Sequence, residues 1–213
     1  MSRVLKQDLF GRIVVDESSP EPVVVRELDA ARPWLRWLAR HLARRETRAL
    51  RHLEGTPGLP RVLAADRHRT LRSWIAGQPM QVARPTDPAY FREALRLLRR
   101  LHARGVVHND LAKEPNWLVT PEGTPALVDF QLALIRARST RLFRALAHDD
   151  LRHLLKHKRT YLAQRLTARQ RRVLEKRSLV SRLWMASGKR VYRFVTRRLL
   201  RWSDREGAGD RQL

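Results

Sequence analysis

Cysteine is absent from all 213 residues of the chain, which excludes disulfide bonds and thiolate chemistry. No run of about 18 apolar residues occurs, so no membrane-spanning helix is predicted. The first ten residues also lack the apolar stretch that a secretory signal needs. Together these absences predict a cytoplasmic protein, because chains without disulfides are usual in that reducing compartment.

Acidic residues are scarce compared with basic ones. The chain has 21 Asp and Glu against 45 Lys and Arg, a formal net charge of +24. Such a surface attracts polyanions such as nucleotides, nucleic acids, anionic lipids and phosphorylated sugars. No zinc-finger, RNP or recognition-helix signature accompanies the charge, so specific nucleic-acid binding is not predicted. Hydrophobic residues make up 43% of the chain, enough for one sizeable core or two small lobes.

The most informative stretch is 105–133, because its polar side chains have a regular arrangement. Asp110 follows His108 by two residues, Asn116 comes six residues later, and Asp129 thirteen residues after that. Short strands are predicted where apolar, β-branched or aromatic residues cluster, at 106–107, 117–120 and 125–128. A Pro-Glu-Gly turn separates the last two strands. Asp110, Asn116 and Asp129 are therefore predicted to meet at the mouth of a small hairpin.

This set of side chains suits phosphoryl transfer, a reaction that needs alignment and charge neutralisation more than covalent help from the protein. Asp110 is predicted to accept the proton of the attacking hydroxyl. Asn116 and Asp129 are predicted to bind Mg²⁺, because this ion prefers hard oxygen ligands and shares them with substrate phosphates. The alternative is an ordinary hairpin in which the same side chains cap turns.

The same residues resemble motifs of the protein kinase superfamily. The sequence His-Asn-Asp-Leu at 108–111 is similar to the catalytic-loop motif H-R-D-L, and Asp-Phe-Gln at 129–131 is similar to D-F-G. The chain most resembles compact bacterial RIO-like kinases and lipopolysaccharide sugar kinases, over roughly residues 5 to 160. This resemblance implies ATP and Mg²⁺ as cofactors, and an α+β bilobal fold without a long activation segment.

The resemblance also implies how the chain divides. Residues 1–80 would form a small antiparallel sheet with one long helix, which apolar residues at three- and four-residue spacing predict over about 33–54. Residues 81–202 would form a mainly helical lobe that carries the catalytic hairpin and includes a basic C-terminal helix. Residues 203–213 are polar and contain glycine, which predicts a flexible tail.

Nucleotide-binding positions in the small lobe follow from the resemblance as well. Gly11 lies between two predicted strands, where kinases have a phosphate-covering loop rich in glycine. Arg26 stands near the end of the strand 23–27 in place of the kinase lysine, and its planar fork would contact the phosphates with altered geometry. Glu46, twenty residues later on the long helix, is the expected ion-pair partner of Arg26. The plain alternatives are a simple hairpin at Gly11 and a solvent-exposed Arg26.

Departures from the kinase pattern leave a scaffolding pseudokinase as an alternative. Asn116 stands six residues after Asp110 rather than five, as if Ala112 were inserted. Lys113 then falls where many kinases have a phosphate-contacting lysine, and we expect it to neutralise charge on the transferred group. Gln131 replaces the glycine of D-F-G, and an arginine replaces the lysine of the small lobe.

Beyond the hairpin, the sequence His-Asp-Asp-Leu at 148–151 is predicted to begin a helix. One of its two acids would either steady the catalytic loop from below, as the resemblance implies, or cap the helix. His153 and His157 have a spacing that can hold zinc, but no third ligand accompanies them. A basic helix face is predicted instead from these histidines together with Arg152, Lys156, Lys158 and Arg159.

Residues 189–202 alternate basic and apolar side chains, which predicts an amphipathic helix. This helix would dock on the large lobe or lie on an anionic membrane surface, and the second option would make the protein peripheral to the inner membrane. The expected phosphoryl acceptor is a protein serine or threonine. A sugar hydroxyl of an anionic glycolipid, such as the lipopolysaccharide core, is the alternative acceptor.

Overall fold

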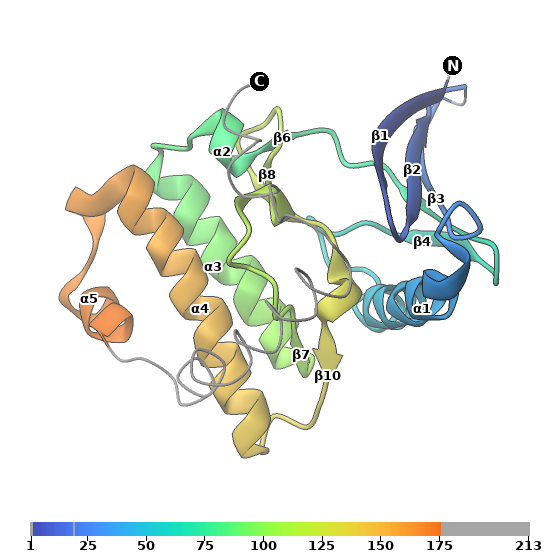
Figure 1. Ribbon diagram of the computed structural model, residues 1–213. Helices are drawn as coiled ribbons and strands as arrows, with labels where there is room; N and C mark the ends of the chain where they lie inside the picture. Colours follow the sequence, from blue (N-terminus) through green and yellow to red (C-terminus); the bar gives the residue numbers. More distant parts are fainter. Residues whose placement is uncertain (1, 19, 176–213) are drawn as a thin grey trace.

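The computed structural model describes residues 2–18 and 20–175 of the chain, which form two lobes (Figure 1). A β-sheet and one long helix make up the N-terminal lobe, whereas helices dominate the C-terminal lobe. This is the α+β, kinase-like bilobal arrangement that the sequence predicts. The predicted basic helix 189–202 and tail 203–213 lie outside the described residues.

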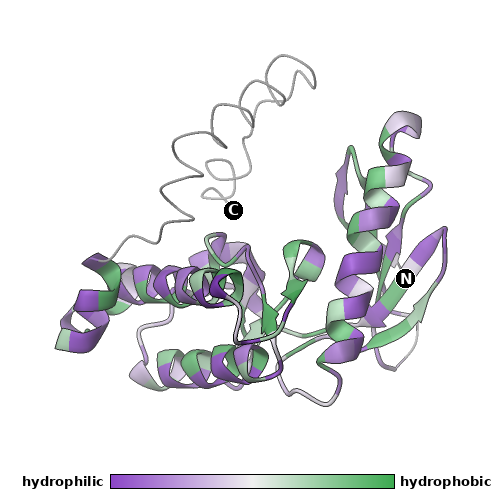
Figure 2. Ribbon diagram, turned by 90° about the horizontal axis from the view of Figure 1, so that it is seen from below, coloured by the Kyte–Doolittle hydropathy of each residue, from purple (hydrophilic) through white to green (hydrophobic). Residues whose placement is uncertain are grey.

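The N-terminal lobe is built on an antiparallel sheet with the strand order β1-β2-β3-β5-β4. Its strands are β1 (Ser2–Asp8), β2 (Gly11–Asp16), β3 (Val23–Glu27), β4 (Val62–Ala65) and β5 (Arg69–Ser73). Side chains alternate between the two faces of a strand, so Val24 and Arg26 of β3 point to the same buried side. Helix α1 (Arg36–His52) follows a 3-10 turn at Pro33–Leu35 and lies along this sheet (Figures 1 and 2).

The chain enters the C-terminal lobe through β6 (Gln78–Pro79) and the short helix α2 (Met80–Ala83). Helix α3 (Pro88–Ala103) then begins as the sequence predicts. The Asp87 carboxylate accepts a hydrogen bond from the backbone amide of Ala89 (2.7 Å), and proline occupies the first helical position. Gly105 ends this segment at φ +74°, where an added Cβ would lie 2.7 Å from the carbonyl oxygen of Arg136.

Two small sheets hold the predicted hairpin. Strand β7 (Val106–Val107) pairs with β10 (Leu134–Ile135), and β8 (Trp117–Val119) lies between β6 and β9 (Pro125–Leu127). The predicted hairpin is therefore present, with β8 and β9 as its two strands. Its flanks contain two 3-10 turns, Glu114–Asn116 and Phe130–Leu132.

Helix α4 (Arg141–Leu162) begins earlier than the sequence analysis predicts. The Thr140 hydroxyl caps it by accepting a hydrogen bond from the backbone amide of Phe143 (3.2 Å), so residues 148–151 lie inside the helix and not at its start.

The prediction of a basic, solvent-facing surface on this helix is also wrong in part. Arg152 and His157 are buried, at 8% and 6% exposure, because this side of α4 packs on the rest of the lobe. After a 3-10 turn at Ala163–Arg165, α5 (Ala168–Glu175) follows.

The two lobes have cores of different size. A large core fills the C-terminal lobe and includes Trp117 and Phe130, both fully buried. The end of α1 contributes Ala49, Leu50 and Leu53 to that same core, so α1 joins the two lobes. The smaller core of the N-terminal lobe lies near the start of α1 and contains Leu28, Ala31, Ala39 and Ala43. None of the described helices combines the length and apolar character that crossing a membrane requires.

Candidate active site between the lobes

The loop between β7 and β8 carries the His-x-Asp motif and is held by α4. The two carboxylate oxygens of Asp150 accept hydrogen bonds from the backbone amides of His108 (2.8 Å) and Asn109 (2.9 Å). Asn109 has φ +63°, a left-handed conformation that these bonds hold in place. Asp150 is thus the acid that steadies the catalytic loop, and the alternative that it caps the start of a helix is wrong.

The His108 side chain is a structural part of the loop. It is fully buried, its Nε2 lies 3.0 Å from the carbonyl oxygen of Val128, and its ring packs on Phe130 with centroids 4.5 Å apart. These contacts join the His-x-Asp loop to the Asp-Phe-Gln segment. The two motifs are therefore fixed relative to each other through side chains that do not face the cleft.

Asp110 lies among the other polar residues predicted for the site. The Lys113 ammonium is 3.1 Å from Asp110 Oδ2, and Asn116 Nδ2 donates to the Asp110 backbone oxygen (2.9 Å) and to Oδ2 (3.2 Å). The 3-10 turn at Glu114–Asn116 accommodates the sixth residue of the spacing, and the two side chains still meet. Burial raises the pKa of the Asp110 carboxyl, although the Lys113 charge acts in the opposite direction.

The underside of this loop is braced by α4. His157 Nε2 lies 2.8 Å from the carbonyl oxygen of Leu111, and the Tyr161 hydroxyl donates to Glu114 (2.8 Å). Burial lowers the pKa of His157, so the neutral imidazole donates this hydrogen bond. His157 is thus engaged in holding the loop, and the described residues include no cluster of three or more side chains able to hold a metal ion with it.

Asp129 enters the site from the other arm of the hairpin. It has a left-handed backbone conformation, φ +64°, and Gln131 Nε2 donates a hydrogen bond to its Oδ1 (2.8 Å). Burial acts to raise the pKa of the Asp129 carboxyl, but the positive charges of Arg26, Arg72 and Lys113 outweigh it and lower the pKa. This carboxylate is therefore charged and ready to bind a cation.

The N-terminal lobe contributes a buried cluster of two arginines and one glutamate. Arg26 Nη2 lies 3.8 Å from Glu46 Oε2, the ion pair that the sequence predicts. The shorter contact is with Arg72, whose Nη1 lies 2.5 Å from Glu46 Oε1. Arg26 and Glu46 are 8% and 4% exposed, and Arg26 Nε is buried without a hydrogen-bond partner among the described residues. The cluster therefore leaves hydrogen-bonding capacity on Arg26 that Glu46 does not use.

Arg72 was not predicted from the sequence. It stands on β5 directly opposite Val24 of β3, so it points to the same side of the sheet as Arg26. The strand also contains Arg69, which is exposed. Only the pairing register of β3 with β5 distinguishes the two arginines, and the sequence alone does not give this register.

An open cavity of about 200 Å³ lies where these groups meet. Asp110, Lys113, Asp129 and Gln131 line it from the C-terminal lobe. From the N-terminal lobe it is lined by Lys6, Asp8, Phe10, Gly11, Ile13, Arg26 and Leu42. The predicted base Asp110, the predicted metal ligand Asp129 and the predicted phosphate contact Arg26 thus border one cleft. The other predicted metal ligand, Asn116, is buried behind Asp110 and is not among the residues that line the cavity.

Gly11 has a packing role that is visible in the structure. An added Cβ would lie 2.4 Å from the carbonyl oxygen of Glu27, so no other residue fits where β2 meets the end of β3. The adjacent turn is closed by Asp8, which accepts a hydrogen bond from the Phe10 amide (2.8 Å). That amide is therefore occupied, although Gly11 itself borders the cleft.

A family model described as the RIO domain matches residues 27–173, more than half of the chain. No curated protein sequence matches the chain. The matched part contains Glu46, Asp110, Asn116 and Asp129, whereas Arg26 stands one residue before its start.

Proposed function

The chain belongs to the RIO-domain family, a member of the protein-kinase-like superfamily of ATP-dependent phosphotransferases, and from this premise we propose what its cleft does. The protein transfers the γ-phosphate of ATP to the hydroxyl of a protein serine or threonine. The observation that supports this most is the convergence of Asp110, Lys113 and Asp129 with Arg26 on one cavity between the lobes. These groups supply the proton acceptor and the positive charge that phosphoryl transfer requires.

Asp110 acts as the general base toward the acceptor hydroxyl. Its pKa is raised by burial, which makes the carboxylate a better proton acceptor than an exposed aspartate. Lys113, 3.1 Å from Asp110 Oδ2, is near enough to balance charge on the transferred phosphate. Arg26 borders the cavity and contacts the nucleotide phosphates there, while Glu46 holds the other side of its guanidinium.

The donor set suits Mg²⁺. Asn116 donates its amide nitrogen to Asp110, which leaves its carboxamide oxygen as a ligand, and Asp129 offers a charged carboxylate. Both are hard oxygen donors of the kind that Mg²⁺ shares with substrate phosphates. When bound there, Mg²⁺ would neutralise charge on the triphosphate.

A radiolabelled-ATP transfer assay tests the proposal. Asp110→Asn and Asp129→Asn should each lower the rate at least about a hundredfold, because each removes a carboxylate that acts directly on the reaction. Glu122→Gln is a matched control, since this exposed acid lies on the turn of the same hairpin and does not border the cavity. Equal transfer by wild type and both cleft variants would refute an enzymatic function.

A pseudokinase is the second candidate, and a specific contact favours it. The hydrogen bond from Gln131 to Asp129 occupies one oxygen of the proposed metal ligand. Gln131→Gly removes that bond without removing the carboxylate. If the wild type binds ATP without transferring phosphate, and Gln131→Gly transfers phosphate, the protein is a nucleotide-binding scaffold.

The acceptor can be identified in the same assay with a host lysate. Radiolabel that protease treatment converts from large species into small water-soluble peptides marks a protein acceptor. Radiolabel that survives protease and enters a phenol–chloroform glycolipid extract marks a sugar hydroxyl of an anionic glycolipid. The Asp129→Asn variant provides the background for both measurements.

A further inference from the structure

A second cavity lies in the N-terminal lobe and shares no lining residue with the cleft. It encloses about 440 Å³ between α1 and the turn that joins β4 to β5. Its floor is made of small or uncharged side chains, which are Leu28, Ala43, Thr47, Ala65 and Thr70. Its rim is made of five arginines, which are Arg40, Arg44, Arg48, Arg51 and Arg67. One acid, Asp66, also borders it.

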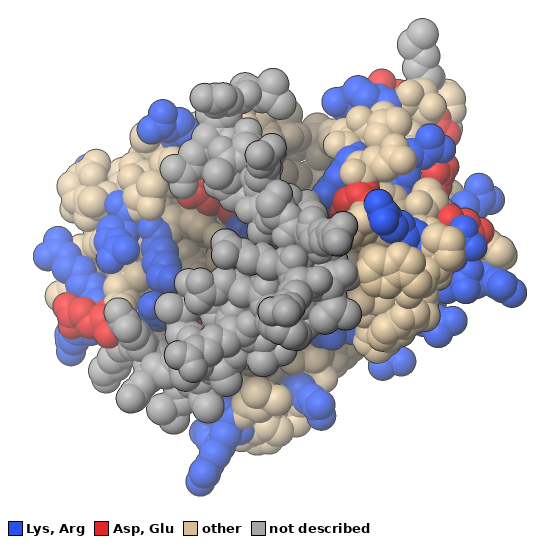
Figure 3. Space-filling model, in the orientation of Figure 1, with Lys and Arg blue, Asp and Glu red and all other residues tan. Residues whose placement is uncertain are grey.

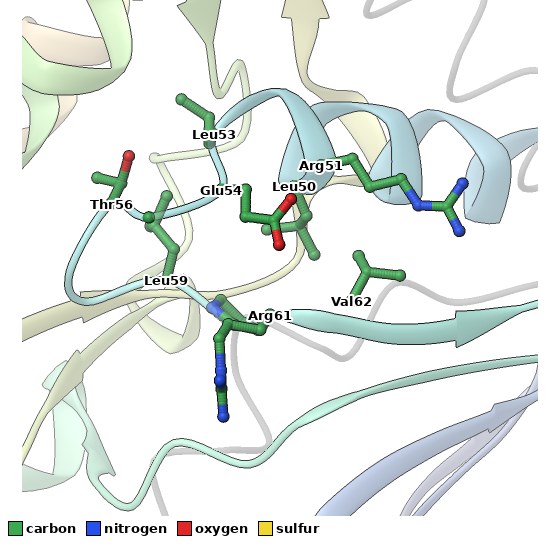
Figure 4. A pocket seen from close by; sticks show the side chains of 10 residues that line it. Leu50, Arg51, Leu53, Glu54, Thr56, Leu59, Arg61 and Val62 are labelled. Carbon is green, nitrogen blue, oxygen red and sulfur yellow. The ribbon is translucent and has the colours of Figure 1, made fainter.

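Four of these arginines form one face of α1. Positions 40, 44, 48 and 51 are separated by four, four and three residues, so their side chains stand above one another on the helix. Figure 4 shows Arg51 extending back along α1 and away from Glu54. Figure 3 shows the basic side chains that border the outer edge of this lobe. Like charges at this spacing weaken a helix, so the arrangement is not explained by helix stability.

The arginine charges are mostly not neutralised within the described part of the chain. Arg40 binds Asp29 (3.1 Å), but the side chains of Arg44, Arg48, Arg51 and Arg67 make no hydrogen bond or ion pair with a described residue. Asp66 does not compensate for them. Its Oδ1 accepts the backbone amides of His68 (2.6 Å) and Arg69 (2.8 Å), which close the β4–β5 turn.

From this geometry we propose that the cavity binds a ligand carrying two or more phosphate groups. Several guanidinium groups around one concave site favour a compact, multiply charged anion, and each fork can bind two phosphate oxygens. The hydroxyls of Thr47 and Thr70 on the floor add neutral donors of a kind that often contacts such oxygens. A free polyphosphate and a phosphate-bearing lipid headgroup share this chemistry.

Inorganic tripolyphosphate serves as the probe for a soluble ligand, measured by calorimetry on the full chain at about 150 mM salt. Arg44→Gln/Arg48→Gln should weaken binding at this site at least about tenfold, because two charged hydrogen-bond donors are lost. Arg92→Gln/Arg99→Gln removes the same charge from exposed positions on α3 and should leave the affinity nearly unchanged. Equal weakening by both pairs would mean diffuse charge attraction and would overturn the proposal.

The catalytic cleft is a competing site for the same probe, and Arg26→Gln separates the two. If the cavity is a site of its own, Arg26→Gln retains a tripolyphosphate site that Arg44→Gln/Arg48→Gln lacks. If Arg26→Gln alone abolishes all binding, the cavity does not bind the probe and the proposal fails. Neither result depends on whether the cleft transfers phosphate, so the proposed function is tested separately.

Sedimentation with phosphatidylcholine vesicles that contain phosphatidic acid tests the lipid-borne source. Loss of vesicle binding alone in Arg44→Gln/Arg48→Gln assigns a lipid phosphate, and loss of tripolyphosphate binding alone assigns a soluble one. If the variant loses neither kind of binding, the proposal is overturned.

Without any anion, the melting temperature of Arg44→Gln/Arg48→Gln should equal or exceed that of wild type, since the helix loses like-charge repulsion. Arg67→Gln, on the turn and outside the helix, provides an independent second variant.

Discussion

The two lobes hold their cleft residues by different means. In the C-terminal lobe, the buried carboxylate of Asp150 accepts two backbone amides and thereby fixes a loop. In the N-terminal lobe, Glu46 binds Arg26 and Arg72, so the connection is an ion-pair cluster between side chains. The first arrangement leaves no alternative partner for the amides. The second leaves one arginine with spare hydrogen-bonding capacity.

This difference agrees with the roles that we propose for the two sides of the cleft. A general base and metal ligands need fixed positions, which backbone hydrogen bonds within a large core provide. A phosphate-contacting arginine has to exchange partners when a nucleotide enters. Sharing Glu46 between two arginines would allow this, because Arg72 would keep the glutamate in place if Arg26 turned toward a nucleotide. The C-terminal lobe is therefore expected to be the rigid half of the site.

The largest effect is predicted for Asp150, whose carboxylate holds the loop of the C-terminal lobe. Asp150→Ala should destabilise the protein by about 4 kcal/mol, because two backbone amides lose their acceptor and each such loss costs about 1–3 kcal/mol. Asp150→Asn keeps one acceptor oxygen and should cost about half as much. Chemical denaturation measures both. A cost under about 1 kcal/mol for the alanine variant would show that the loop does not depend on this carboxylate.

The ion-pair cluster of the N-terminal lobe should give the next largest effect. Glu46→Gln should cost about 3 kcal/mol, since it removes the carboxylate that pairs directly with two largely buried guanidinium groups. Arg72→Gln should raise KM for ATP more than it lowers kcat, because Glu46 would then draw Arg26 away from the nucleotide. Arg72→Lys should restore KM in part.

The exposed pair Arg12–Glu27 is the control for this cluster. Its atoms approach to 2.7 Å, closer than Arg26 and Glu46, yet both side chains are more than a third exposed. Arg12→Gln should therefore change stability far less than Glu46→Gln, and high salt should remove what effect there is. Similar losses for both variants would contradict the view that burial makes the cluster important.

A smaller effect on activity is predicted for Lys113. Its charge lowers the pKa of Asp110 against the raising effect of burial, so Lys113→Met should shift the acidic limb of the rate profile to higher pH. Above that limb the rate should fall about tenfold, because one charge near the transferred phosphate is lost. A pH profile of kcat for the two proteins measures both changes. An unmoved acidic limb would mean that Asp110 is not the titrating base.

The parts of the site that could be predicted from the sequence are those with local spacing. His108, Asp110, Asn116 and Asp129 lie within one stretch, and a turn with two short strands is enough to bring them together. Glu46 was found because it is the only acid within the body of the predicted helix and stands twenty residues after Arg26, close to the spacing in kinases. The two-lobe α+β fold followed from the same motifs.

What could not be predicted depends on contacts between distant elements. Arg72 is recognisable only through the register of β3 with β5. The start of α4 was placed too late, because the two acids at 149 and 150 look like capping residues and the cap is Thr140. Asp150 lies inside the helix and turns inward to the catalytic loop, a choice made by tertiary packing. The arginine-lined cavity also needs α1 and the β4–β5 turn side by side, which the sequence does not show.

The smallest effect is predicted for His153 of the C-terminal lobe, and it concerns how the stability of the protein changes with pH. Burial lowers the pKa of His153 on α4 to about 4, whereas its ordinary value is 6.5. Between these values the unfolded chain binds the proton and the folded chain does not, so stability falls as the pH drops below 6.5, and the loss stops growing near pH 4. At pH 5 the loss should be about 1 kcal/mol after allowance for the partial exposure of the ring.

His153→Gln should remove this part of the acid sensitivity and leave stability at pH 8 nearly unchanged. Thermal unfolding of both proteins between pH 8 and pH 5 measures the difference. His153 lies on α4 in the C-terminal lobe, so this substitution should leave the Arg26–Glu46–Arg72 cluster of the N-terminal lobe unchanged. If stability falls equally between pH 8 and pH 5 with and without His153, the imidazole is protonated without cost in the folded chain. The C-terminal lobe is then less tightly packed around α4 than its contacts indicate.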